Sequence, residues 1–422
     1  MTAVITGVGA VSAFGVGVAP LFAGLAAGSG AVSTIRSFDA STFPTHVAGE
    51  VPVPRLDAAW LRELLGEACA PLADELDAAG ALRDRKVGFA LVAADEAWRS
   101  AGCGDGERAA ALVMALGLEQ ALLDDLPPFY DPAARAITWP QAACFAGTRF
   151  RSRVDLAART VHRMLALAGP ITVNASACAA GTLAIGHAAS LIERGAADVV
   201  LCGGADSMVN PLGLGGMCRL GAPSPRDAID ACRPFDRRRD GLVIGEGAAM
   251  FVVESAARAR ARGARPFAAI LGWGSTQDGY RVTAPRPDGA AARRAMARAL
   301  ARSGLPATAI GYVNAHGTGT PLNDPAECLA IRGALGAHPA VSSIKGAVGH
   351  LMAAAGALEL AASLLVFERD LLPGTANHAE RDPACDLDIV GAQPRTARVE
   401  ALMSNSFGFG GQNASIVLGR CA

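Results

Sequence analysis

The chain of 422 residues is long enough for two or three domains, or for one pair of fused lobes. Hydrophobic residues make up 51% of it and charged residues 18%, which supplies a large buried core and excludes a disordered chain. The formal net charge of −1 and the 5% of aromatic residues give neither the basic surface nor the stacking platforms typical of nucleic-acid binding, so no nucleic-acid partner is expected.

The first 35 residues carry no charged side chain, a pattern that also occurs in membrane spans. Seven glycines interrupt the run and no basic segment precedes it, so we predict neither a membrane span nor a signal peptide. A buried strand over residues 2–7 and a helix over 19–27 are expected instead. The ten cysteines form no CxxC pair and no zinc-spaced cluster with histidine, which is typical of reduced thiols in a cytoplasmic protein.

The segment up to residue 167 gives a mixed pattern. Apolar residues at three- and four-residue spacing, or in short runs, predict helices over 58–79, 93–102 and 153–167, strands over 87–92 and 109–116, and a loop over 126–139.

From residue 170 onward, short apolar strands alternate regularly with helices. The strands are predicted over 171–175, 198–202, 245–254, 311–314, 341–344, 401–407 and 413–418, and the helices over 179–194, 290–303 and 351–367. Continuous apolar strands alternating with helices indicate an α/β protein with a parallel or mixed sheet covered on both faces. Two such strand–helix halves are expected to lie back to back.

Cys178 lies between a predicted strand, 171–175, and a predicted helix, 179–194. The free amide groups and partial positive charge of a helix N-terminus lower the pKa of a thiol and make it a better nucleophile. A buried structural cysteine explains the position equally well. Because a nucleophile needs partners, the rest of the chain decides between the two interpretations.

Two histidines come after predicted strands in a similar way. His316 comes after strand 311–314, and His350 after strand 341–344 at the start of a helix. Ligands of layered α/β proteins usually bind where strands end, and a helix N-terminus should lower the pKa of His350 and keep it a neutral donor. Either histidine alone is explained as well by a core residue. Together with Cys178 they indicate a reaction that develops negative charge on a thioester oxygen.

Lys345 is one of only two lysines among 38 basic residues, the other being Lys86. We interpret position 345 as one where an arginine could not replace the lysine. The alternative is that a few lysines remain by chance in a chain whose basic residues are mostly arginine. Glu327 is a candidate counter-ion for Lys345, or else an acid that complements the N-terminus of its own helix.

Four spaced motifs resemble the β-ketoacyl–acyl carrier protein synthases of the KAS I/II type, which belong to the thiolase superfamily. They are SACAAG around Cys178, NAHGTGTPLNDPAE around His316, SIKGAVGHLMAAAG with Lys345 and His350, and NSFGFGGQN near the C-terminus. The resemblance extends in order over residues 1–420.

The resemblance implies a decarboxylative Claisen condensation of an acyl thioester with a malonyl-type extender, in fatty-acid or polyketide biosynthesis. Cys178 would take the acyl group from a phosphopantetheine arm. His316 and His350 would promote decarboxylation and stabilise the enolate. The amide groups of Cys178 and Phe409 would form the oxyanion hole, and Phe409 would gate the two half-reactions.

The same resemblance implies roles for further residues. Lys345 would organise His350, with Glu327 nearby, and Thr318 and Thr320 would hydrogen-bond the pantetheine arm. No organic cofactor and no catalytic metal are implied. Some relatives hold a structural monovalent cation, Na⁺ or K⁺, whose ligands map to Asn314, Ala315, Glu359, Ser404 and Asn405.

The implied fold is the α/β thiolase fold, with two related βαβαβαββ halves in a five-layer αβαβα arrangement. The half over 1–257 would carry the cysteine, and the half over 258–422 the histidine and lysine motifs. An acyl carrier protein is the expected partner, together with a second subunit that is either identical or a ketosynthase-like chain.

The resemblance is weak over residues 85–170, where Leu118, Glu119 and Gln120 stand in place of small residues. This region shapes the acyl pocket and the dimer contact in the family. Acyl chain length, extender, pathway, carrier protein and the identity of the second subunit therefore stay open.

Four other functions use the same fold. An acyltransferase or a decarboxylase could share every residue named. A chain-length-determining partner of a heterodimer would typically lack the nucleophile, so Cys178 argues against it. A thiolase would need a second reactive cysteine, and the glycine motif over 408–411 has none.

Overall fold

The computed structural model describes residues 1–53, 55–104, 107–117, 122, 130–131, 136–137 and 153–421. Leu118, Glu119 and Gln120 lie outside these residues. So does most of the predicted loop over 126–139, within which only the paired strands β6 (Tyr130–Asp131) and β7 (Ala136–Ile137) are described.

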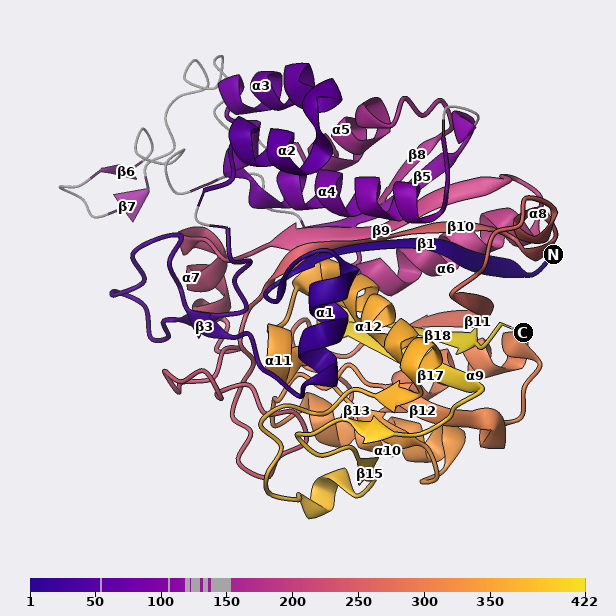
Figure 1. Cartoon of the computed structure of the whole chain (residues 1–422). Helices are drawn as coiled ribbons and strands as arrows, with labels where there is room; N and C mark the ends of the chain where they lie inside the picture. The colour runs from indigo at the N-terminus through magenta and orange to yellow at the C-terminus, as the bar shows by residue number, and fades with distance from the viewer. Residues whose placement is uncertain are drawn as a thin grey trace.

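Each half of the chain contributes five corresponding strands in the same order (Figure 1), and two short strands, β2 (Gly15–Val16) and β15 (Asp388–Ile389), pair with β1 and β13. The N-terminal strands are β1 (Ala3–Ser12), β5 (Ala111–Leu116), β8 (Ile171–Asn174), β9 (Val199–Ser207) and β10 (Glu246–Ser255). The C-terminal strands are β11 (Ala268–Gln277), β12 (Ile310–Asn314), β13 (Ala340–Ser342), β17 (Ala401–Gly408) and β18 (Gln412–Gly419).

In each half the first strand pairs antiparallel with the fifth, and the fifth antiparallel with the fourth. The fourth, second and third strands then run parallel. The first strands of the two halves, β1 and β11, also pair, so the two sheets join along one edge. This repeat confirms the predicted α/β class and the two related halves. The boundary predicted at residue 257 falls within α8 (Ala256–Ala261) and stays a prediction.

The sheets and helices stack in five layers (Figure 1). Two helices, α6 (Ala180–Glu193) and α12 (Ala355–Arg369), lie between the sheets. The N-terminal sheet is covered outside by α4 (Arg85–Ser100) and the C-terminal sheet by α9 (Ala290–Ser303). A helix enclosed on all sides must be apolar all round, and every residue of α12 from Ala355 to Phe367 is buried.

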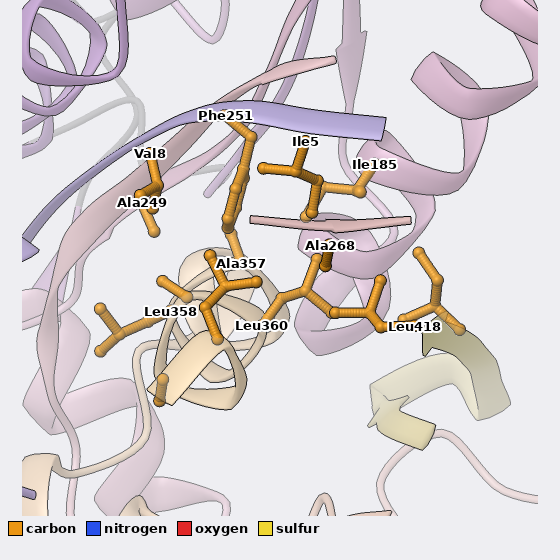
Figure 2. Packing of buried hydrophobic residues seen from close by; sticks show 14 of the residues in the cluster. Ile5, Val8, Ile185, Ala249, Phe251, Ala268, Ala357, Leu358, Leu360 and Leu418 are labelled. Carbon is orange, nitrogen blue, oxygen red and sulfur yellow. The ribbon is translucent and has the colours of Figure 1, made fainter. Parts of the chain in front are cut away.

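The central core joins the two halves. Figure 2 shows Val8 and Phe251 of the N-terminal sheet packed toward Ala357 and Leu358 of α12. Burial of this apolar surface holds the strand ends of both halves at one place.

Shorter elements complete the described chain. The remaining helices are α1 (Val18–Ala26), α2 (Ala58–Leu65), α3 (Ala70–Ala78), α5 (Leu156–Met164), α7 (Pro211–Arg219), α10 (Asn323–Leu335) and α11 (Lys345–Val348). The remaining short strands are β2 (Gly15–Val16), β3 (Ser33–Thr34), β4 (Val47–Ala48), β14 (Leu371–Leu372), β15 (Asp388–Ile389) and β16 (Arg395–Thr396).

The predicted strand over 87–92 is wrong, because these residues lie inside α4. This part of α4 is buried from Lys86 to Ala94, and a short apolar run does not distinguish a buried helix from a buried strand. The single helix predicted over 58–79 is also wrong: Gly66, with φ of 82°, ends α2 before α3 begins.

No helix among the described residues combines the length and the apolar character needed to cross a membrane. The uncharged N-terminal run contains β1, β2 and α1. The strand predicted over 2–7 lies largely within the longer β1, and the helix predicted over 19–27 corresponds to α1.

Candidate active site

Three strand ends bring the predicted cysteine and both histidines to one cavity of ≈ 360 Å³. Cys178 comes from the turn after β8, His316 from the loop after β12, and His350 from the segment after β13. Thr318, Thr320 and Phe409 line the same cavity. The predicted convergence of distant motifs is therefore present.

Cys178 sits in a strained turn at the start of α6. The residue before it, Ala177, has φ of 48°, a left-handed conformation that non-glycine residues rarely adopt. The backbone of Phe409 lies close enough to the Cys178 sulfur to lower the pKa of the thiol. A Cβ on Gly408 would lie 3.0 Å from the Cys178 amide nitrogen, so a glycine lets the β17–β18 connection approach this closely.

The Cys178 thiol is protonated in the free protein. Burial raises its pKa to about 11, while the charge of Lys345 and the Phe409 amide act in the opposite direction. The predicted lowering of this pKa is therefore wrong. The cysteine is 5% exposed, and loss of water around the thiolate outweighs the helix terminus.

The imidazole rings of His316 and His350 lie edge to face, with an angle of 81° between their planes and ring centroids 5.3 Å apart. The Met352 amide donates to Nδ1 of His350 at 3.3 Å, which leaves Nε2 to carry the ring proton. Burial, reinforced by the charge of Lys345, lowers the pKa of His350 well below its usual range. The ring is thus the neutral donor predicted, although burial rather than a helix dipole is the main cause.

His316 is fixed at three points. Its backbone N–H donates to Glu327 at 2.8 Å, and the Lys345 ammonium contacts both its carbonyl oxygen and, at 3.3 Å, its Nδ1. An ammonium that donates to Nδ1 leaves the proton on Nε2, as in His350. Burial, followed by the charges of Lys345 and His350, keeps the pKa of His316 well below its usual range.

Lys345 is 1% exposed and forms an ion pair with Glu359 of α12, not with Glu327. The predicted Glu327 counter-ion is therefore wrong. The ammonium contacts His316, and the predicted role of Lys345 in organising His350 stays a prediction. Burial raises the pKa of the Glu359 carboxyl, and Lys345 opposes that rise. An ammonium fits this enclosed position, whereas a guanidinium is larger and planar.

Two carboxylates in the first turns of α10 hold the loop after β12. Glu327 accepts the amides of His316 and Gly317, both at 2.8 Å. Asp324 accepts those of Thr318 and Gly319 at 3.1 and 3.2 Å. Sequence reasoning missed Asp324; its place one turn before Glu327, just after a glycine loop, is the signal that could have found it.

Burial raises the pKa of Glu327 to about 7, against the lowering effect of the two amides. The carboxyl therefore titrates near neutrality while it braces the loop.

Other residues of the cavity have supporting positions. The Oγ1 atoms of Thr318 and Thr320 are 2.9 Å apart. Phe407, which the sequence motifs did not single out, packs against the His316 ring with centroids 5.8 Å apart. Asp278 accepts an N–H of Asn413 at 2.8 Å and ties the cavity rim to the start of β18.

Family models match most of the chain. Residues 2–259 match the β-ketoacyl synthase N-terminal domain, and residues 267–379 match the β-ketoacyl synthase C-terminal domain. A 3-oxoacyl-[acyl-carrier-protein] synthase 2 of Coxiella burnetii is 36% identical over 99% of this chain and 98% of its own length. The protein of the same name in Synechocystis sp. is also 36% identical, over 98% of this chain and 96% of its own length.

Solved structures resemble the whole chain. A β-ketoacyl synthase from Burkholderia phymatum is 32% identical, with a TM-score of 0.85 and full coverage of both chains. The ishigamide ketosynthase/chain length factor is 32% identical, with a TM-score of 0.84, and the match covers 100% of this chain and 99% of that chain. The structure of a type II PKS acyl-carrier protein in complex with its ketosynthase, bound to the hexaketide, contains a chain that is 27% identical in sequence. Its TM-score is 0.84, and the match covers 100% of this chain and 99% of that chain.

Proposed function

Because the chain belongs to the β-ketoacyl synthase family, we propose that it condenses an acyl thioester with a malonyl-type extender on an acyl carrier protein, with loss of carbon dioxide. The predicted thiolase fold is confirmed by the same relatives. One observation carries the proposal: the Cys178 thiol and two neutral imidazoles line one cavity.

The first half-reaction is acyl transfer to Cys178. The sulfur attacks the carbonyl of the incoming thioester, and the amides of Cys178 and Phe409 stabilise the oxyanion. The pantetheine thiol leaves with the proton that the cysteine gives up. The high pKa of the free thiol means that this proton is lost during attack and not beforehand.

The second half-reaction is decarboxylation of the extender. The Nε2–H groups of His316 and His350 are free to donate to its thioester oxygen, where negative charge develops as carbon dioxide leaves. The carbanion then attacks the acyl-Cys178 carbonyl, and the cysteine thiolate is expelled and takes up a proton. Thr318 and Thr320, which line the same cavity, would bind the pantetheine arm.

A structural Na⁺ or K⁺ would fit beside this machinery. Among the described residues, Asn314 Oδ1, Ser404 Oγ and Glu359 Oε2 are buried oxygens without a hydrogen-bond partner. Asn314 and Ser404 are register partners on neighbouring strands. A cation bound there, with Ala315 and Asn405 completing the set, would fix Glu359 and through it Lys345.

The edge strand β8 is the proposed contact with a second subunit. Within the described residues β8 pairs only with β5, and Ile171 at its start is 37% exposed. An exposed apolar edge strand is a template for pairing with another chain. The second subunit is either a copy of this chain or a ketosynthase-like partner. Sedimentation analysis of the purified chain distinguishes the two.

The test is intact-mass analysis of the protein with carrier proteins that bear short, medium and long acyl chains, followed by malonyl carrier protein. We expect an acyl adduct on Cys178 and then a product longer by two carbon atoms. The Cys178→Ala variant should form no adduct while still releasing carbon dioxide. Transfer of the acyl group without elongation would instead identify an acyltransferase.

A further inference from the structure

We propose that Asp206 is a positioning residue, which holds the turn that orients His350 and places a negative charge next to the Cys178 thiol. This inference rests on the roles proposed above for Cys178 and His350. Asp206 is the penultimate residue of β9 and is 1% exposed.

The contact between Asp206 and the turn is direct. Its Oδ2 accepts the backbone N–H of Ala353 at 2.8 Å in a buried, charge-assisted hydrogen bond. The preceding amide, that of Met352, donates to Nδ1 of His350. Because the two amides are consecutive in one turn, the carboxylate that fixes the second also fixes the first. Asp206 therefore acts on the proton position of the His350 ring through the backbone.

The turn needs such support. Met352 has φ of 45°, a left-handed conformation that persists in a non-glycine residue only when its surroundings hold it. The end of β9 packs directly against the same turn: a Cβ on Gly204 would lie 3.3 Å from the Ala353 carbonyl oxygen. The strand thus supplies both the close packing and the carboxylate.

Asp206 also acts on the nucleophile. Its charge helps raise the pKa of the Cys178 thiol, against the charge of Lys345. One residue from the N-terminal half thus supports the histidine of the C-terminal half and adds to the larger effect of burial, which disfavours the thiolate of Cys178.

The first test is the pH profile of Cys178 alkylation by iodoacetamide, followed by peptide mass analysis. Asp206→Asn keeps the shape and an acceptor oxygen but removes the charge. We expect its alkylation at about pH 8 to be severalfold faster than that of wild type, because loss of the charge lowers the pKa of the thiol and increases the thiolate fraction. Glu96→Gln is the matched control, because Glu96 also accepts two backbone amides but does not line the cavity.

The second test separates the half-reactions in Asp206→Ala, which removes the acceptor. Malonyl carrier protein decarboxylation should fall about tenfold, while acyl loading of Cys178 stays within about twofold. An unchanged alkylation profile in Asp206→Asn, or equal losses of loading and decarboxylation in Asp206→Ala, would overturn the inference. A wild-type protein that neither loads nor decarboxylates contradicts the proposed function instead, and the alkylation profile still tests Asp206.

Discussion

The two halves of the molecule share one order of strands but differ in the chemistry that they place after the third strand. In each half a short turn with a left-handed first residue leads directly into a central helix: Ala177 before α6 and Met352 before α12. The next residue is Cys178 in one half and Ala353 in the other. The same strained turn therefore presents a nucleophile in one half and only a backbone amide in the other.

The C-terminal half moves its chemistry to other positions. His350 precedes the turn, and His316 comes after the second strand, where the carboxylates of α10 hold its loop. In the proposed mechanism, one half thus carries the acyl group and the other activates the extender. The two halves therefore share a backbone arrangement, but the side chains at corresponding positions differ.

The largest expected effect tests this division. His350→Ala removes one of the two donors at the developing enolate, so decarboxylation should fall by about 10²–10³-fold. Acyl loading of Cys178 should fall by less than about tenfold. Loading and decarboxylation are measured separately by intact mass and carbon dioxide release. His338→Ala, outside the cavity, is the control and should change neither. Parallel loss of both reactions would contradict the division between halves.

Lys345→Arg should reduce condensation about a hundredfold, which is the cost of misplacing a reacting group by about 1 Å. The larger guanidinium cannot keep the contacts of the ammonium with Glu359 and His316. Turnover of purified variants measures the effect. Near-normal turnover would refute the interpretation drawn from the scarcity of lysine.

The carboxyl of Glu327 should make stability depend on pH. Burial raises its pKa from 4.5 to about 7, so the folded protein retains a proton that the unfolded chain has already lost. Its contribution is complete below about pH 4.5 and is lost as the pH rises to about 7. At about 1.4 kcal/mol per pKa unit, the difference of about 2.5 between the two pKa values makes this loss about 3 kcal/mol. Denaturant unfolding between these pH values should show a smaller loss for Glu327→Gln, and an equal loss would assign the effect to other groups.

The smallest expected effect concerns the crossing of the two central helices. A Cβ on Gly356 of α12 would lie 2.3 Å from Thr182 Oγ1, and one on Gly181 of α6 would lie 2.7 Å from the Ala357 nitrogen. Gly356→Ala and Gly181→Ala should each lower the free energy of unfolding by about 1–2 kcal/mol in denaturant titration. Gly216→Ala, with open space at its Cβ, should be neutral or stabilising. Tolerance of both central substitutions would show that the two halves are not packed this closely.

Much of the site could be predicted from the sequence, because strand ends and glycine loops mark where polar side chains emerge. Cys178, His316 and His350 occupy the expected cavity. The partner of Lys345 could not be predicted, since Glu359 lies in the buried and mostly apolar part of α12 and no local pattern links it to Lys345. Asp206 was missed for the same reason: its partner Ala353 is 147 positions away in the chain.

The sequence by itself determined the family, the alternation of strands and helices after residue 170, and which side chains carry the chemistry. Local patterns suffice there, because propensity and motif spacing are properties of neighbouring residues. Only the tertiary structure decided that residues 87–92 lie in a helix and that the Cys178 thiol is protonated. Both depend on burial, which is set by segments distant in the chain, and removal of water changes a pKa more than a nearby helix end does.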